Sequence, residues 1–359
     1  MPNLYRQYFD PEQFGRPYAD PEEHLLDLVR WCELLLAAYL PCYAPQIPWA
    51  KTWEGDADPD RVREDVLRDF DKALFHVDAR ARASGERGDF LAAQYVREVW
   101  KLTNAEWFAL ILWLLPAYDE RFGPLLGQLQ GSSVLRRPSL DLVLKLFHFV
   151  DRAEDVGRYH AQRRALEEKL EYAFLRQDGA LDARAADFLL HNGTTRLDAA
   201  AGETYLPPEE GEPLPVGEKE ARELADAVAA DGSERETLFI CLRGGPGSGR
   251  ASRVRRVSQL LEVPAVFFDC AQAVYARRED FFAALRTAGR ETVLVQGMLV
   301  LRQFQRLLEE PETAARVLET AGRYSGVVFV LAEPETVTVE LAQHRRWIEE
   351  EVQIGRAHV

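Results

Sequence analysis

The chain has 359 residues, 47% hydrophobic and 29% charged, which is the composition of a folded globular protein and excludes wholesale disorder. With 44 basic and 59 acidic residues the net charge is −15, which argues against a protein that binds nucleic acid or an anionic membrane through bulk charge. The length exceeds that of one ordinary domain and predicts two or three.

The first 150 residues repeat apolar side chains at helical spacing, so we predict an all-α N-terminal domain over residues 1–150. The predicted helices cover residues 21–40, 60–83, 90–102, 104–115 and 138–147. Pro21 and the two glutamates after it are typical of a helix start. We expect Asn104 to cap the fourth helix, Pro116 to end it, and Ser139 to cap the fifth.

Residues 151–200 change character. Short helices are predicted over 165–175 and 182–190, separated by turns, and this pattern fits a small winged-helix-like module over 151–200. From residue 201 to 220, four prolines stand among glutamates, which is typical of an acidic linker.

Residues 221–353 alternate between short apolar runs and helical patterns. Strands are predicted over 237–242, 265–268, 292–295 and 326–331, with helices over 251–261, 279–287, 299–308 and 312–322. Apolar strands that alternate with helices predict an α/β domain, with a parallel sheet covered on both faces.

One loop of this α/β domain has the pattern of a phosphate-binding loop, because it follows a predicted strand and opens a predicted helix. Its residues are Gly244, Gly245, Pro246, Gly247, Ser248, Gly249, Arg250, Ala251 and Ser252. Glycines let successive backbone N–H groups point at one centre, and a helix N-terminus adds partial positive charge. These nine positions are the predicted cofactor-binding site, with ATP or ADP as the candidate ligand.

The catalytic parts of the pattern G-x-x-x-x-G-K-[ST] are missing. Arg250 stands at the lysine position and Ala251 at the hydroxyl position, and Ser252 would point about 100° away on a helix. The predicted strand 292–295 ends in Gln296 and Gly297 rather than in two acidic residues. We therefore predict no hydrolysis at this loop and no magnesium site; nucleotide binding without hydrolysis and an empty glycine turn both stay open.

Five arginines, at positions 243, 250, 253, 255 and 256, lie near the loop in a stretch without acidic residues. Such a cluster attracts phosphate, but it could equally form ion pairs with an acidic neighbour. No other catalytic or metal constellation is predicted, because the seven histidines show no metal spacing and the four cysteines form no pair motif, as expected of reduced, mostly buried thiols. The N-terminus is no signal peptide, and the longest apolar run, 107–115, is shorter than the roughly 20 residues of a membrane span, so we expect a cytoplasmic protein.

The loop GGPGSGR, the strand that ends in Asp269 and the strand that ends at Leu331 resemble an AAA+ P-loop ATPase core. The layout is similar to bacterial AAA+ proteins with a winged-helix-like N-terminal region, including those encoded with contractile injection systems. SSVLRRPSLDLVLKLF and ALDARAADFLLHNG resemble segments of that region, although His191 and Asn192 interrupt the second match. In that family a degenerate first ATPase module, often with arginine in place of the loop lysine, precedes an active second module.

The resemblance implies that the full-length protein is an ATPase that forms a homo-oligomeric ring and recruits a protein partner or substrate through its helical region. Only Gly244, Gly247, Gly249 and Arg250 match the phosphate-loop positions of the family, so this chain is expected to be catalytically inactive. Residues 354–359, IGRAHV, correspond to the translation of a common sequencing adapter, and we expect them to be an artefact at the end of an N-terminal fragment.

Two other functions are alternatives to an AAA+ ATPase-like protein that binds nucleotide. One is a non-enzymatic interaction scaffold that keeps the P-loop fold with an empty loop. The other is a winged-helix DNA binder, which the net charge of −15 and the lack of a basic recognition helix disfavour.

Overall fold

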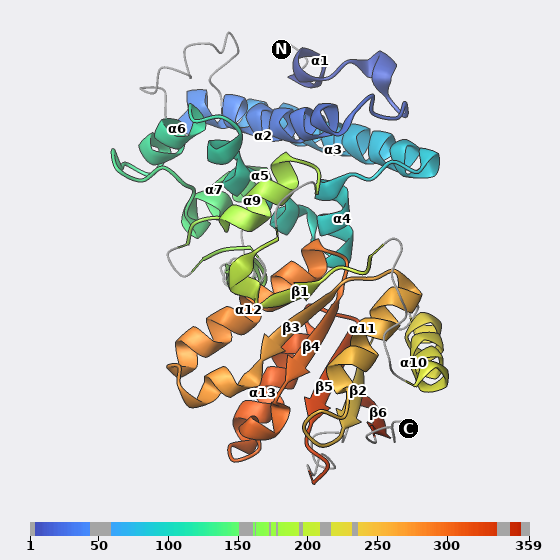
Figure 1. The fold of residues 1–359 in the computed structure, drawn as a ribbon. Helices are drawn as coiled ribbons and strands as arrows, with labels where there is room; N and C mark the ends of the chain where they lie inside the picture. Colours follow the sequence, from blue (N-terminus) through green and yellow to red (C-terminus); the bar gives the residue numbers. More distant parts are fainter. Residues whose placement is uncertain are drawn as a thin grey trace. The chain divides into compact units, whose positions relative to one another are not determined.

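The computed structural model describes residues 4–43, 59–150, 161, 163–171, 174–176, 179–193, 197–208, 217–231, 236–335 and 345–352. The chain divides into two compact units, Met1–Thr195 and Arg196–Val359, each with its own core (Figure 1). The expected domain boundary at residue 150 falls inside the first of these units.

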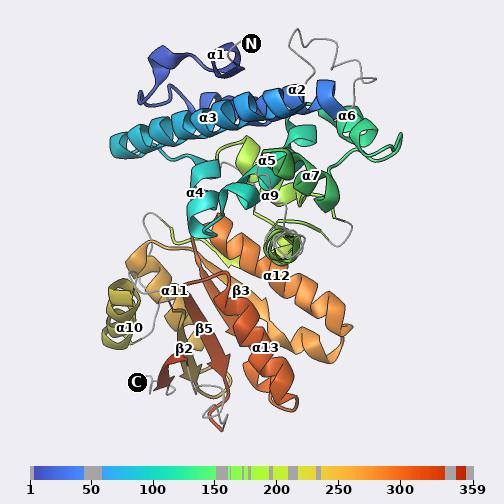
Figure 2. The ribbon, with the colours of Figure 1, turned by 180° about the vertical axis from the view of Figure 1, so that it is seen from behind.

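The N-terminal unit is helical, as predicted. Its α-helices are α1 Leu4–Tyr8, α2 Pro21–Tyr43, α3 Pro59–Arg87, α4 Ala92–Val99, α5 Asn104–Tyr118, α6 Phe122–Leu129, α7 Leu140–Val150 and α9 Ala183–Leu190, with the π-helical segment Glu167–Glu171 and the 3-10 turn Pro11–Gln13. The five helices predicted over the first 150 residues correspond to α2, α3, α4, α5 and α7. Long helices α2 and α3 lie side by side (Figures 1 and 2), and α5 packs against α2.

Helix α5 differs from its prediction at both ends. Its N-cap is Thr103 rather than Asn104: the Thr103 hydroxyl accepts from the Glu106 amide at 3.3 Å, and the Glu106 carboxylate accepts from the Thr103 amide at 2.7 Å. This reciprocal capping box satisfies two N–H groups that the helix itself leaves free. Pro116 does not end the helix, which continues to Tyr118. Every residue from Glu106 to Leu115 is buried, so the core holds this helix from all sides.

The C-terminal unit contains a six-stranded sheet in the order β1-β3-β4-β5-β2-β6. Its strands are β1 Glu203–Tyr205, β2 Leu238–Arg243, β3 Ala265–Asp269, β4 Met298–Arg302, β5 Val327–Ala332 and β6 Arg346–Glu351. All neighbouring pairs are parallel except β1 with β3. The α/β class and the mostly parallel sheet are therefore confirmed.

Helices cover both faces of this sheet (Figures 1 and 2). The helices are α10 Glu218–Asp231, α11 Arg250–Leu261, α12 Arg278–Leu294 and α13 Pro311–Gly322. One core joins α10 and α11 to the sheet through residues such as Leu224, Val257 and Phe267, and the other joins α12 and α13 through residues such as Phe281 and Val317. Alternate strand residues point to opposite faces, so the nearly continuous apolar strands fill both cores.

The third predicted strand and the helix after it are wrong. Residues 292–294 belong to α12, and the strand is β4, Met298–Arg302, where the sequence predicted a helix over 299–308; a 3-10 turn, Phe304–Leu307, follows it. Helix α12 ends because Gln296 adopts a left-handed conformation, with φ of 54°, and the Gly297 amide donates to Thr292 O at 2.7 Å. The run 292–295, rich in β-branched residues, lies at the end of α12 and suggested a strand. The buried apolar run that forms the strand, Met298–Leu301, lies after it.

The sheet also begins earlier than predicted. Strand β1 lies inside the segment 201–220 that was expected to be a linker, and α10 begins at Glu218 at its other end. Residues 209–216, which contain two of the linker prolines, lie outside the described residues, as do residues 354–359. In the N-terminal unit, Ser139 caps α7 as predicted, accepting from the Leu142 amide at 3.2 Å.

No helix in the part of the chain that the structure describes is both long and apolar enough to cross a membrane. Cys32, Cys241 and Cys270 are buried and free, as expected, and burial raises the pKa of the Cys241 thiol to about 12.

Candidate functional site

Residues 244–252, which we call the glycine loop, connect β2 to α11 at the carboxyl edge of the sheet. Gly247 and Gly249 have φ of +76° and +86°, the left-handed region that glycine enters without steric cost. Gly249 is the N-cap of α11, so the loop leads directly into the N-terminus of a twelve-residue helix. The strand, loop and helix that the sequence predicted here are therefore confirmed.

Gly244 is required for a different reason, which is the close approach of another segment. A Cβ atom placed there would lie 2.6 Å from the Val352 carbonyl oxygen and 2.6 Å from Ser248 Oγ. The Gly244 amide donates to Ala332 O, at the end of β5, at 3.1 Å. The start of the loop is thus held between the ends of β5 and β6.

The glycine loop opens onto a cleft of about 360 Å³. Residues 247–252 line it together with Arg302, Gln303, Gln305 and Leu331. Arg302 ends β4, the strand two places from β2 in the sheet, and Gln303 follows it. The structure therefore brings together the loop and the end of β4, and the residues there carry a guanidinium and an amide rather than two carboxylates. Ser252, which was expected to point away, also lines the cleft.

Sequence reasoning missed Arg302 and Gln303 because it placed the strand at 292–295. The run Met298–Leu301, four apolar residues followed by a charged one, was the signal that could have found them. The prediction that the strand ends in Gln296 and Gly297 is wrong, because β4 ends at Arg302 and Gln303 follows it.

Arg250, at the position of the phosphate-loop lysine, is directed to the protein backbone. Its guanidinium donates to Ala332 O, the carbonyl that also accepts from the Gly244 amide. Burial lowers the pKa of Arg250, while the Glu333 carboxylate opposes that shift, and an arginine keeps its charge at any ordinary pH. The Arg250 guanidinium thus holds the end of the glycine loop against the end of β5.

The other four arginines of the cluster form ion pairs. Their partners are Glu349 for Arg243 at 3.2 Å, Glu350 for Arg253, Glu203 for Arg255, and Glu218 for Arg256 at 2.8 Å. The hydrogen bond from Arg256 is the main cause that lowers the pKa of Glu218 to about 2. Of the two alternatives for this cluster, the salt-bridging surface is the one observed.

Two carboxylates near the cleft are engaged by amides. Asp269 ends β3 and caps the following 3-10 turn, accepting from the Ala271 amide at 3.0 Å and from Gln303 Nε2. Glu333 accepts from Gln305 Nε2 at 3.0 Å.

Arg302 pairs with Glu203 of β1 at 2.9 Å. Among the described residues, no three His, Cys, Asp or Glu side chains gather into a metal-binding group.

The fold and the loop define a protein with a helical N-terminal unit and a three-layered α/β unit. A family model described as "Winged helix domain, variant" matches residues 10–201, more than half of the chain, and the chain belongs to this family. The matched region begins at residue 10 and ends just before β1. It is therefore much longer than the winged-helix-like module expected over residues 151–200. No curated protein matches the chain.

Proposed function

We propose that this chain is the N-terminal part of an AAA+ ATPase-like protein whose P-loop module binds a nucleotide without magnesium and does not hydrolyse it. The single observation that carries the proposal is the cleft that Arg302 and Gln303 share with the glycine loop. In P-loop ATPases the strand end that faces the loop supplies a carboxylate for magnesium, beside the hydroxyl of the loop. Here that end presents a cation and an amide, and Ala251 has no hydroxyl.

The strand order supports the P-loop assignment. The glycine loop follows β2, which lies between β5 and β6, and the neighbouring strands run parallel with their carboxyl ends at the loop edge. Ligands of open parallel sheets bind at this edge, where a helix N-terminus adds favourable charge for phosphate. Arginine pairs readily with phosphate oxygens, so Arg302 neutralises phosphate in place of a metal ion once it exchanges its present partner, Glu203, for the nucleotide.

The second candidate function is an interaction scaffold with an empty loop. The contact from Arg250 to Ala332 O favours it, because a bound phosphate chain would have to compete with this backbone carbonyl for the guanidinium. The ion pairs of the other four arginines favour it as well, since they leave the surface around the loop neutralised.

A calorimetric titration of the chain with ATP separates the two. We expect saturable binding up to about 5 mM ATP, above the usual range of substrate KM values, with the same affinity in EDTA and in magnesium. We expect no release of phosphate. Magnesium-dependent turnover, lost in the variant Ser252→Ala, would contradict the proposal. Absence of saturable heat would favour the interaction scaffold as the function. The scaffold would then act within the ring that the full-length protein is proposed to form.

The N-terminal unit has the role of recruiting a protein partner. A winged-helix protein that binds DNA needs a helix with a basic face, and neither α5 nor α9 has one. Helix α5 has no lysine or arginine and is buried, and α9 has only Arg184. Salt-dependent retention of the chain on duplex DNA would contradict this assignment.

A further inference from the structure

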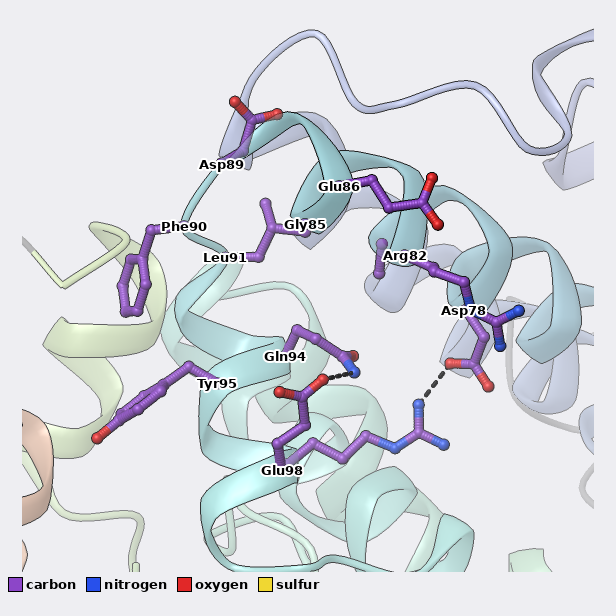
Figure 3. Close-up of a pocket in the computed structure, with 12 residues that line it drawn as sticks. Asp78, Arg82, Gly85, Glu86, Asp89, Phe90, Leu91, Gln94, Tyr95 and Glu98 are labelled. Atoms are coloured by element: carbon purple, nitrogen blue, oxygen red, sulfur yellow. Dashed lines mark hydrogen bonds and ion pairs between the residues drawn. The ribbon is translucent and has the colours of Figure 1, made fainter. Parts of the chain in front are cut away.

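The N-terminal unit contains a cleft of about 720 Å³, within the size range of binding pockets. It lies between the last turns of α3 and helix α4, and we call it the α3–α4 cleft (Figure 3). Its volume is about twice that of the cleft at the glycine loop.

One end of the α3–α4 cleft is apolar. Phe90 and Tyr95 lie together there (Figure 3), with ring centroids 5.5 Å apart, and Leu91, which also lines the cleft, is buried. Phe90 is 38% exposed although it belongs to an aromatic cluster. Burial raises the pKa of Tyr95 to about 12, so its phenol remains a hydrogen-bond donor at neutral pH. A large exposed aromatic ring beside a polar rim is typical of a protein-binding surface.

The rest of the lining is mostly charged. Four carboxylates line the cleft, those of Asp78, Glu86, Asp89 and Glu98, against the guanidinium groups of Arg82 and Arg97. Asp78 is occupied by Arg97, which also donates to Asn104 Oδ1 at 3.0 Å, and Asp89 is occupied by Arg87.

Glu86 and Glu98 are the carboxylates that remain available. Glu98 accepts from Gln94 Nε2 at 2.8 Å, and in the described part of the chain no cation pairs with either glutamate. Both residues are exposed, Glu86 on α3 and Glu98 on α4. Among the described residues these two carboxylates face one guanidinium, that of Arg82, for which no acidic partner is found, so the cleft keeps a small excess of negative charge that a cationic side chain would meet.

The aromatic end is held in place by the end of α9. Asn192, which adopts a left-handed conformation with φ of 49°, accepts from the Ala92 amide at 2.7 Å and donates to Phe90 O at 2.9 Å. A Cβ atom on Gly193 would lie 3.1 Å from the Phe90 ring, so the glycine lets that ring pack closely. The Asn-Gly pair thus fixes both sides of Leu91, and a fixed binding surface loses little entropy when it binds.

From the juxtaposition of acidic and aromatic side chains we infer that the α3–α4 cleft binds a basic segment of a partner protein. Lysine or arginine side chains of that segment pair with Glu86 and with Glu98, and a neighbouring apolar side chain packs on the exposed ring of Phe90. The inference rests on the proposed partner-recruiting role of the N-terminal unit and names the chemistry of the partner. The excess of carboxylates disfavours a phosphate-bearing ligand at the same place.

The test uses the full chain and two fluorescent peptides with a photo-crosslinking group, one alternating lysine with leucine and phenylalanine, the other with glutamate in place of lysine. We expect the basic peptide to bind and to attach within residues 78–98, as located by mass spectrometry. The double variant Glu86→Lys, Glu98→Lys should weaken binding about tenfold or more, since two attractive charges become repulsive. The matched control Glu120→Lys, which changes an exposed glutamate outside the cleft, should leave binding unchanged.

Equal affinity in the double variant, attachment outside the cleft, or preference for the acidic peptide would overturn the inference. Melting curves of the three proteins establish that each is folded. None of the substituted residues lines the glycine loop, so failure of ATP binding would leave this result unaffected. Failure of the peptide to bind would remove the partner chemistry while the nucleotide proposal stands.

Discussion

Gln303 donates its side-chain amide to both carboxylate oxygens of Asp269, at 3.1 and 3.2 Å. This contact joins the ends of two neighbouring parallel strands, β4 and β3, beside the cleft of the glycine loop. An amide is suited to this place, because a carboxylate at position 303 would face Asp269 directly and like charges repel.

The variant Gln303→Glu tests this contact. We expect the chain to lose about 1 kcal/mol of stability at neutral pH, since a hydrogen bond is replaced by repulsion between two carboxylates. The loss should shrink as the pH falls below about 4, where carboxylates take up protons. Thermal melts at several pH values measure both effects, and Gln128→Glu, at an exposed position of α6, is the isosteric control. A pH-independent loss would contradict the repulsion. The variant should also gain no ATPase activity.

The two glycines that open the loop should respond differently to alanine. Gly244→Ala places a Cβ atom 2.6 Å from the Val352 carbonyl oxygen, so the loop or the end of β6 must shift, and a loss of about 1–3 kcal/mol is expected. Gly245→Ala is the matched control, because a Cβ there meets nothing within 4 Å and its φ is not positive. Denaturation curves compare the two variants. Equal stability would show that Val352 does not hold the loop in solution.

His24 makes the N-terminal unit sensitive to acid. The ring is buried, 4.9 Å from that of Tyr18, and burial lowers its pKa to about 3, with Arg80 and Arg97 adding to the shift. The unfolded chain, with a value of 6.5 for this group, binds more protons between these two values. The stability of wild type should therefore be full above about pH 6.5 and fall toward pH 3, by up to about 1.4 kcal/mol per pH unit.

The variant His24→Gln should lose part of this pH dependence, because glutamine takes up no proton in either state. His191→Gln is the control, since His191 is exposed at the C-cap of α9. Urea denaturation between pH 7 and pH 4.5 gives the two slopes. A slope for His24→Gln as steep as that of wild type would assign the acid sensitivity to other groups, among them His76, whose pKa burial also lowers.

Asn192 should be the most sensitive residue in the turn after α9. Asn192→Ala removes hydrogen bonds to Phe90 and Ala92 and places alanine at φ of 49°, so a loss of about 2–3 kcal/mol is expected. Asn192→Asp keeps the acceptor for the Ala92 amide and should lose less. Thermal unfolding ranks the variants, with His191→Ala as the neighbouring control. If the aspartate and alanine variants lose equal stability, the Ala92 contact contributes nothing.

The amino-acid sequence by itself determined the class of each unit. Helical periodicity predicted α2, α3, α4, α5 and α7, because each buries a stripe of side chains that recurs at the helical repeat. Buried strands flanked by turn residues predicted β2, β3 and β5, and the glycine loop was predicted from its own residues, since glycines at left-handed positions are a local requirement. The cap that Asp269 forms is also a local contact, because the amide that donates to it belongs to Ala271, two residues further along the chain.

Only the tertiary structure decided where β4 lies and what faces the loop. Apolar runs on both sides of Gln296 and Gly297 were compatible with strand and with helix, and the choice depended on which run pairs with β3 and β5. The arginine cluster shows the same limit: its partners Glu203, Glu218, Glu349 and Glu350 lie 38 to 106 residues away in the chain, so no local pattern could distinguish a phosphate site from a set of ion pairs. The sequence shows which residues are charged, but only the folded structure shows which acidic side chains neutralise these arginines.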